Sequence, residues 1–75
     1  MKTNTLKRGD RVRLRNGWEA DIADNKRGNI RMATVYGFVT EMGSVYAHDI
    51  VAAKVGETWE MIEHTPAQIK LRKLL

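Results

Sequence analysis

The sequence predicts a mainly β fold, a small barrel of about five to six short strands followed by a short C-terminal helix. Over residues 11–15 and 18–23, apolar and polar residues alternate, which places every second side chain on one face of a strand. Six glycines punctuate the chain at intervals of 6 to 13 residues, a spacing typical of turns between short strands. Near the C-terminus, Thr65 and Pro66 open a segment that carries the start signals of a helix.

The first two strands form a hairpin whose register follows from the side chains. A three-residue loop over residues 15–17, with Gly17 in the left-handed position of a bulge, keeps both faces consistent. On the inner face this register pairs apolar residues, Leu14 with Trp18 and Val12 with Ala20. On the outer face it pairs opposite charges, Arg13 with Glu19 and Arg11 with Asp21. Two strand arginines then have carboxylate partners and are less free to hold a ligand, and Trp18 packs on the core side.

The remaining strands are expected, in order, over residues 30–40, 44–46, 51–55 and 58–63. The turn at residues 24–29 is rich in residues that tolerate positive φ. Gly37 is expected to bend or bulge the long third strand, as a small barrel requires at a corner. Residues 47–50 are too few and too polar for a strand, so we expect one helical turn there.

The last ten residues have the pattern of a capped helix. Thr65 caps the helix, Pro66 takes its first position, and Gln68 stands three residues after the cap, as in a capping box. So short a helix is not stable alone in water. Its apolar side chains must therefore pack on the barrel or on a partner: Ile69, Leu71, Leu74 and Leu75. We divide the chain into a barrel over residues 1–64 and this helix over residues 65–75.

Length and composition exclude several classes of protein. In a chain of 75 residues, only roughly 60% of the unfolded surface is buried, so a deep cleft between two lobes has no room to form. The absence of cysteine excludes disulfides, thiolate zinc sites and cysteine nucleophiles. No apolar run approaches the roughly 20 residues of a membrane span, and residues 1–14 lack the apolar core of a signal peptide. We therefore expect a cytoplasmic protein without membrane contact.

The net charge of +4 is unevenly distributed along the chain. Residues 1–15 hold six basic residues against one acidic residue, and residues 66–75 hold three basic residues. Residues 41–65 hold five acidic residues against one lysine, while residues 16–40 are neutral. Such asymmetry steers a basic face toward polyanions and leaves an acidic face for basic partners.

Two segments resemble the ends of SH3-like barrels. Residues 7–14, Lys-Arg-Gly-Asp-Arg-Val-Arg-Leu, resemble the opening of KOW-type domains, in which a Gly-Asp turn leads into an alternating strand. Residues 43–51, Gly-Ser-Val-Tyr-Ala-His-Asp-Ile-Val, resemble the closing pattern of strand, helical turn and strand. The resemblance covers residues 7–55 and implies contacts with RNA or DNA. The glycine-rich basic stretch typical of KOW domains is replaced here by Asn-Gly-Trp-Glu at residues 16–19.

The same opening, with residues 43–45, also resembles the plasmid-borne type II dihydrofolate reductases, SH3-like barrels that assemble around one pore. Their functional Val-Gln-Ile-Tyr stretch falls at residues 45–48, which here read Val-Tyr-Ala-His. The resemblance therefore implies self-association but not the reductase activity.

The basic residues point first to a non-catalytic module that contacts nucleic acid. Guanidinium groups match phosphates and stack on bases, and aromatic side chains at Trp18, Tyr36 and Tyr46 can provide stacking platforms. Five basic residues form the predicted nucleic-acid site: Arg8, Arg15, Lys26, Arg27 and Arg31. Among them, Arg15 and the pair at residues 26–27 have no evident carboxylate opposite them.

The alternative is a protein-interaction module, an adaptor or inhibitor of the type common in phages and mobile elements. The last strand mixes acidic and large apolar side chains, and the C-terminal helix is amphipathic. The predicted protein interface consists of Trp59, Met61, Ile69, Leu71 and Leu74. The partner is then another protein or a second copy of the chain.

Catalysis and metal binding have little support in the sequence. His48 and His64 are 16 positions apart, which is no metal-ligand spacing, and Ser44 lacks the context of a nucleophile. The adjacent Asp49 is best explained as a turn residue rather than as the partner of His48 in an acid–base pair. We expect no cofactor and no metal.

Overall fold

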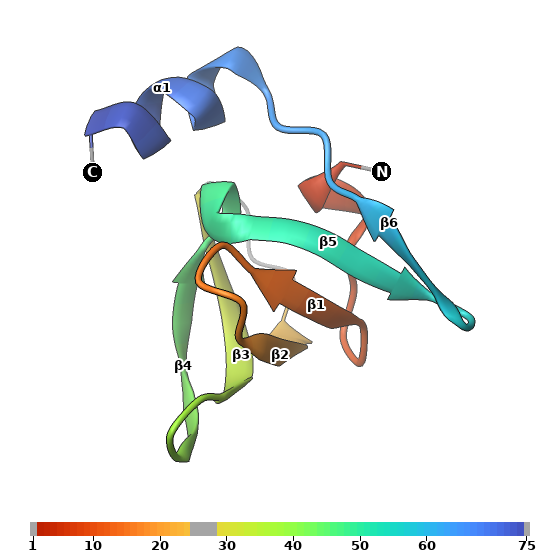
Figure 1. Ribbon diagram of the computed structural model, residues 1–75. Coiled ribbons are helices and arrows are strands. Elements are labelled where there is room, and N and C mark those ends of the chain that lie inside the picture. Colours follow the sequence, from red (N-terminus) through yellow and green to blue (C-terminus); the bar gives the residue numbers. More distant parts are fainter. Residues whose placement is uncertain (1, 25–28, 75) are drawn as a thin grey trace.

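The computed structural model describes residues 2–24 and 29–74, and its main element is one antiparallel sheet of six strands (Figure 1). The strands are β1 Arg11–Leu14, β2 Glu19–Asp24, β3 Ile30–Tyr36, β4 Thr40–Tyr46, β5 Ile50–Val55 and β6 Thr58–Met61. Two 3-10 turns, η1 Thr3–Thr5 and η2 Ala47–Asp49, and one helix, α1 Pro66–Leu74, complete the chain. The predicted mainly β class with a C-terminal helix is confirmed.

The sheet is not closed into the predicted barrel. The strand order is β4-β3-β2-β1-β5-β6, so β4 and β6 are its two edges. After the short strand β6, the chain forms a parallel bridge between Glu63 and Lys2 and continues toward the helix. The end of the sheet beyond β6 is therefore occupied by the N-terminal segment, and the edge of β4 is left open.

The predicted register of the first hairpin is confirmed. Arg11 lies opposite Asp21, and Val12 lies opposite Ala20. Gly17 adopts a φ of +92°, and its N–H bonds to the carbonyl of Leu14 at 2.9 Å. The tight loop thus depends on a backbone conformation that favours glycine.

The predicted strands over residues 30–40 and 44–46 are wrong in their bounds: β3 ends at Tyr36, a bend follows at residues 37–39, and β4 runs without interruption from Thr40 to Tyr46. Trp18 explains part of this change, because its ring occupies the space that a side chain at position 37 would need. The ring also meets Phe38 edge-on, with centroids 5.5 Å apart. Trp18 is 38% exposed and lies outside the buried cluster, so its predicted place in the core is wrong.

The core lies on the inner face of the curved sheet. Its buried cluster contains Leu6, Val12, Leu14, Ala20, Ile22, Ala33, Ile50, Ala53 and Ile62. Arg31 is also fully buried, and one of its guanidinium nitrogens donates to the carbonyl of Ile30 at 2.9 Å. Burial lowers the pKa of Arg31 from its ordinary value, because desolvation disfavours the charged form.

The capping box predicted for the helix is confirmed. The N–H of Gln68 donates to the hydroxyl of Thr65 at 3.2 Å, and the N–H of Thr65 donates to the side-chain oxygen of Gln68 at 3.0 Å. The amide of Gln68 also donates to the hydroxyl of Thr3, which ties α1 to η1. Helix α1 packs near η2, and none of its residues is fully buried. Within the described ranges no helix is long and apolar enough to cross a membrane.

Candidate functional site

On the outer face of the sheet, four side chains form a self-contained network that we name the outer cluster: Arg11, Glu19, Asp21 and Tyr36. Arg11 donates to both carboxylates, reaching Glu19 at 3.2 Å, and its guanidinium lies 4.8 Å from the centre of the Tyr36 ring. The Tyr36 hydroxyl donates to Asp21 at 2.7 Å. Each charge in the outer cluster therefore already has its partner.

Two pKa values in the outer cluster are shifted by these contacts. Burial alone raises the pKa of Asp21, but hydrogen bonds from Arg11 and Tyr36 outweigh it, and the net pKa lies below its ordinary value. The hydrogen bond that the Tyr36 hydroxyl donates to Asp21 raises the pKa of Tyr36. Both shifts favour the hydrogen-bonded state that the structure shows, so the outer cluster stabilises the sheet rather than presenting a charge to a ligand.

Arg13 does not take the partner that its register position suggests. It lies opposite Glu19 in the strand pairing, but its guanidinium stacks 4.3 Å from the centre of the Trp59 ring. The carboxylate of Glu19 is bound by Arg11 instead. The predicted interface residue Trp59 is accordingly half-buried, with Arg13 over its ring.

The structure does not gather the five predicted nucleic-acid residues. Arg8 is exposed in the turn before β1, whereas Arg31 is fully buried and cannot reach a ligand at the surface. Arg15 is not free, because its guanidinium pairs with Asp49 at 3.1 Å. The other two predicted residues, Lys26 and Arg27, lie outside the described residues.

The predicted protein interface is also divided. Met61 on β6 is 70% exposed, and Leu71 and Leu74 are exposed on α1, while Ile69 is half-buried. Strand β6 pairs with β5, but α1 packs beside η2, and Figure 1 shows the two elements apart. The strand and the helix therefore present separate apolar surfaces.

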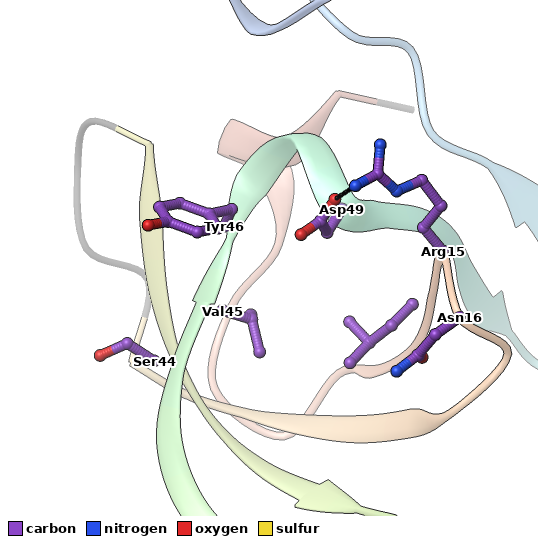
Figure 2. Close-up of a pocket in the computed structure, with 7 residues that line it drawn as sticks. Arg15, Asn16, Ser44, Val45, Tyr46 and Asp49 are labelled. Carbon is purple, nitrogen blue, oxygen red and sulfur yellow. Dashed lines mark ion pairs between the residues drawn. The ribbon is translucent and has the colours of Figure 1, made fainter. Parts of the chain in front are cut away.

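A pocket of about 240 Å³ opens between the β1–β2 loop and the end of β4 (Figure 2). It is lined by Leu14, Arg15, Asn16, Ser44, Val45, Tyr46 and Asp49. Figure 2 shows Arg15 and Asp49 together on one side of the pocket, Val45 extending into it, and Tyr46 at the end of β4 with its ring directed away from the Arg15–Asp49 pair. Among the residues that the structure describes, no strand pairs with the outer edge of β4, so this entrance to the apolar inner face lies beside an unpaired strand edge.

Two hydrogen bonds that involve backbone groups hold the β1–β2 loop and the charged rim in place. The N–H of Arg15 donates to the carbonyl of Asp49 at 2.7 Å, which fixes the β1–β2 loop against η2. The side-chain oxygen of Asn16 accepts from the N–H of Trp18 at 3.0 Å. The amide nitrogen of Asn16 is therefore the part of that side chain left to donate to a ligand.

A buried histidine supports the aromatic rim. The ring of His48 stacks on the ring of Tyr46, with centroids 5.0 Å apart and planes 11° from parallel. The amide nitrogen of Asn29 lies 2.8 Å from Nδ1 of His48, within hydrogen-bond distance. His48 covers one face of Tyr46, and the Tyr46 side chain is still 46% exposed.

Asp49 retains capacity to accept a hydrogen bond. Its Oδ1 forms the ion pair with Arg15 and lies 3.8 Å from Nε2 of His48. Within the described part of the chain, neither this oxygen nor His48 Nε2 has a hydrogen bond of good geometry. Oδ1 is buried, whereas the Asp49 side chain as a whole is 29% exposed, so a ligand donor meets the exposed part of the carboxylate.

A second hollow, of about 170 Å³, adjoins the pocket and is lined by Ile30, Ser44, Val45 and Tyr46. The two hollows share three of these residues, including Tyr46, which therefore borders both. The arrangement provides one aromatic ring beside two adjacent spaces.

Sequence reasoning singled out Tyr46 as an aromatic platform and Arg15 as a basic contact, but it missed Asn16 and treated Asp49 as a turn residue only. The available signal was the order Tyr-Ala-His-Asp at residues 46–49. In a single 3-10 turn this order buries His48 and leaves Tyr46 and Asp49 on either side of it at the surface.

Comparisons with protein-family models, with curated proteins and with solved structures give no match to this chain. The pocket and its charged and aromatic rims are therefore the basis on which a function is inferred.

Proposed function

We propose that the protein is a non-catalytic module that binds single-stranded nucleic acid and holds an unpaired base in the pocket between Tyr46 and the Arg15–Asp49 pair. The observation that carries the proposal is the pocket itself. Its lining combines an aromatic side chain, Tyr46, with the hydrogen-bonding pair Arg15 and Asp49, and with apolar Leu14 and Val45. Unpaired bases are recognised by this combination of stacking and polar contacts to their edges.

The stacking surface is rigid. His48 is fully buried and supports one face of Tyr46, while its bond to Asn29 fixes the imidazole. A ring held in this way loses little conformational entropy when a base stacks on it. Tyr46 is thus better suited to a base than a freely rotating surface aromatic would be.

The electrostatic part of the proposal comes from the helix. Helix α1 packs against η2, the element that holds Asp49, and three basic residues follow one another along it: Lys70, Arg72 and Lys73. We propose that these side chains contact the phosphates of a strand bound at the pocket. In the proposal, these helix residues take the place of the basic face expected from residues 1–15, because Arg11 is paired with carboxylates and Arg13 is stacked on Trp59.

Binding is favoured over catalysis because no activated nucleophile faces the pocket among the residues described. The Ser44 hydroxyl contacts the sulfur of Met32 at 3.3 Å and, as Figure 2 shows, points away from Asp49. The carboxylate of Asp49 is engaged by Arg15. A hydrolytic site would need a nucleophile in contact with a base.

Fluorescence anisotropy tests the proposal, with labelled single-stranded RNA, single-stranded DNA and duplex DNA at about 50 mM and about 200 mM salt. We expect single strands to bind more tightly than the duplex and affinity to fall with salt. Tyr46→Ala should weaken binding about tenfold, because stacking contributes roughly 1–3 kcal/mol per base.

Tyr36→Ala is the matched control, since Tyr36 lies on the neighbouring strand with similar exposure and belongs to the outer cluster. It should leave affinity unchanged. Circular dichroism establishes that each variant is folded. An equal loss of affinity in both variants, or no salt-sensitive binding to any strand, would overturn the proposal.

A second function, protein binding, is favoured by the exposed apolar side of α1. A nine-residue helix is not stable by itself in water, yet Leu74 remains 73% exposed and Leu71 is exposed as well. We propose that a second copy of the chain covers these side chains. Sedimentation velocity tests this: the full chain should form dimers, and Leu71→Ser with Leu74→Ser should yield monomers. A monomeric full chain at all concentrations would exclude it.

A further inference from the structure

Resting on the proposed function, we infer that the pocket selects guanine among the four bases. The reason is the order of hydrogen-bonding groups at its charged rim. Arg15 can only donate and Asp49, when ionised, can only accept, and the two groups are in contact at 3.1 Å. A ligand edge that lies along this rim therefore meets one donor group beside two acceptor oxygens.

Guanine presents the complementary edge. Its O6 is an acceptor, and the adjacent N1–H and N2–H₂ groups are donors. In the proposed complex Asp49 accepts from N1–H and N2–H₂ while Arg15 donates to O6. Charge-assisted hydrogen bonds of this kind are stronger than those between neutral groups.

The other bases leave this rim unmatched. Adenine and cytosine place a ring nitrogen acceptor where guanine has N1–H, so a lone pair would face the carboxylate. Uracil supplies one N–H between two carbonyls, and the second carbonyl would oppose an Asp49 oxygen. Because an unmatched buried polar group is penalised by its full desolvation cost, such a site discriminates strongly.

The size and the neighbouring side chain agree with a single purine. The pocket volume of about 240 Å³ is below the roughly 300 Å³ at which pockets for drug-sized molecules begin, so it fits one base rather than a whole nucleotide. Asn16, whose oxygen is held by the N–H of Trp18, has its amide nitrogen free to donate to the guanine O6 or N7.

A peptide fits the same rim less well. A peptide carboxylate would be attracted by Arg15 but repelled by Asp49, and a peptide cation would have to compete with Arg15 for the same oxygen. A neutral planar ligand with both donors and acceptors is not repelled by either charge and does not need to displace Arg15 from Asp49. The rim chemistry therefore favours a base over a charged peptide group.

The test compares three single strands that differ at one position: an all-uridine strand, the same strand with one central guanosine, and the same strand with one central inosine. Inosine lacks only the N2 amino group. We expect the guanosine strand to bind at least about tenfold more tightly than the uridine strand, with inosine between them, as one lost charge-assisted bond predicts.

Asp49→Asn is the specificity variant. The amide keeps the size of the side chain but replaces one acceptor with a donor, so the guanosine and inosine strands should bind equally. The residual affinity should still fall when Tyr46→Ala is added, which separates stacking from edge recognition. Arg15→Gln provides a second variant, which should lower the guanosine affinity without unfolding the chain.

The outcomes separate the two inferences. Equal binding of all three strands, with a loss in Tyr46→Ala, would overturn guanine selection and leave the proposed function standing. Tighter binding of the uridine strand, or an unchanged guanosine preference in Asp49→Asn, would also overturn it. No binding of any strand would overturn both inferences.

Discussion

The outer cluster and the pocket rim contain the same three kinds of side chain in different states of completion. Each has an arginine, a carboxylate and a tyrosine: Arg11, Asp21 and Tyr36 in the first, Arg15, Asp49 and Tyr46 in the second. In the outer cluster Glu19 supplies a second carboxylate, and the tyrosine hydroxyl donates to Asp21. At the pocket rim the arginine has one carboxylate, and the tyrosine ring stacks on His48.

The difference follows from where each group lies in the fold. The outer cluster occupies facing positions of the paired strands β1, β2 and β3, where the register brings Arg11 opposite Asp21 and Glu19 opposite Tyr36. The pocket rim is built from a loop and a 3-10 turn at the open edge of the sheet. Residues inside a strand ladder satisfy one another, whereas residues on loops held by a rigid scaffold remain available to ligands.

Substitution of His48, the buried residue beneath Tyr46, should have the largest effect on stability. His48→Ala removes a fully buried ring, the support beneath Tyr46 and the acceptor for Asn29. We expect the free energy of unfolding to fall by about 2–4 kcal/mol, from the lost packing and the unsatisfied amide. Urea denaturation monitored by circular dichroism measures it.

His64→Ala is the control for that experiment. His64 is half-buried, and its Nε2 contacts the carbonyl of Ile50 at 2.8 Å. Its loss should cost about 1 kcal/mol, the typical net contribution of one hydrogen bond. Equal losses in the two variants would mean that His48 is no more important to the fold than a partly exposed histidine.

Substitutions of Arg11 and Arg15 should have opposite effects on stability and on binding. Arg11→Ala breaks ion pairs to Asp21 and Glu19 that are partly exposed, so we expect a loss of about 1 kcal/mol in unfolding free energy and unchanged affinity for single strands. Arg15→Ala should do the reverse, with stability nearly unchanged and affinity lowered severalfold. Denaturation and anisotropy on both variants measure the contrast. A loss of affinity in Arg11→Ala equal to that in Arg15→Ala would remove the distinction between the two regions.

The sequence predicted the parts of the fold that depend on local rules. The bulged loop at Gly17, the register of the first hairpin and the capping box at Thr65 are each decided by residues close together in the chain. The open sheet was not predictable in this way. Whether β4 meets another strand depends on where the segment after β6 runs, and that segment pairs with Lys2 instead.

The candidate site was predictable in its residue types but not in its pairings. A long guanidinium side chain can reach several neighbours, and sequence register identifies only the one directly opposite. Arg13 stacks on Trp59 although Glu19 lies opposite it. Arg15, in the β1–β2 loop, pairs with Asp49 in η2, which is distant in the sequence. Arg31 looked like a surface charge because nothing in its strand pattern indicates burial of a charged residue.

The smallest predicted effect is the pH dependence of the outer cluster. Because hydrogen bonds outweigh burial and lower the pKa of Asp21 in the folded state, this carboxylate contributes stability above its unfolded pKa. That contribution should be lost as the pH falls through the lower folded pKa. It should amount to less than about 1 kcal/mol, since the pair is partly exposed. NMR titration of the Asp21 carboxyl should give a pKa below the ordinary aspartate value.

Tyr36→Phe sharpens that measurement, because it removes one of the two hydrogen-bond donors that lower the pKa of Asp21 and leaves the two bonds from Arg11. The pKa of Asp21 should rise toward its ordinary value, and the acid-labile part of the stability should shrink with it. An unchanged pKa would mean that Arg11 alone holds the charge of Asp21. Tyr36 would then not be required by the outer cluster, and the contrast between a completed and an open network would rest on the arginines only.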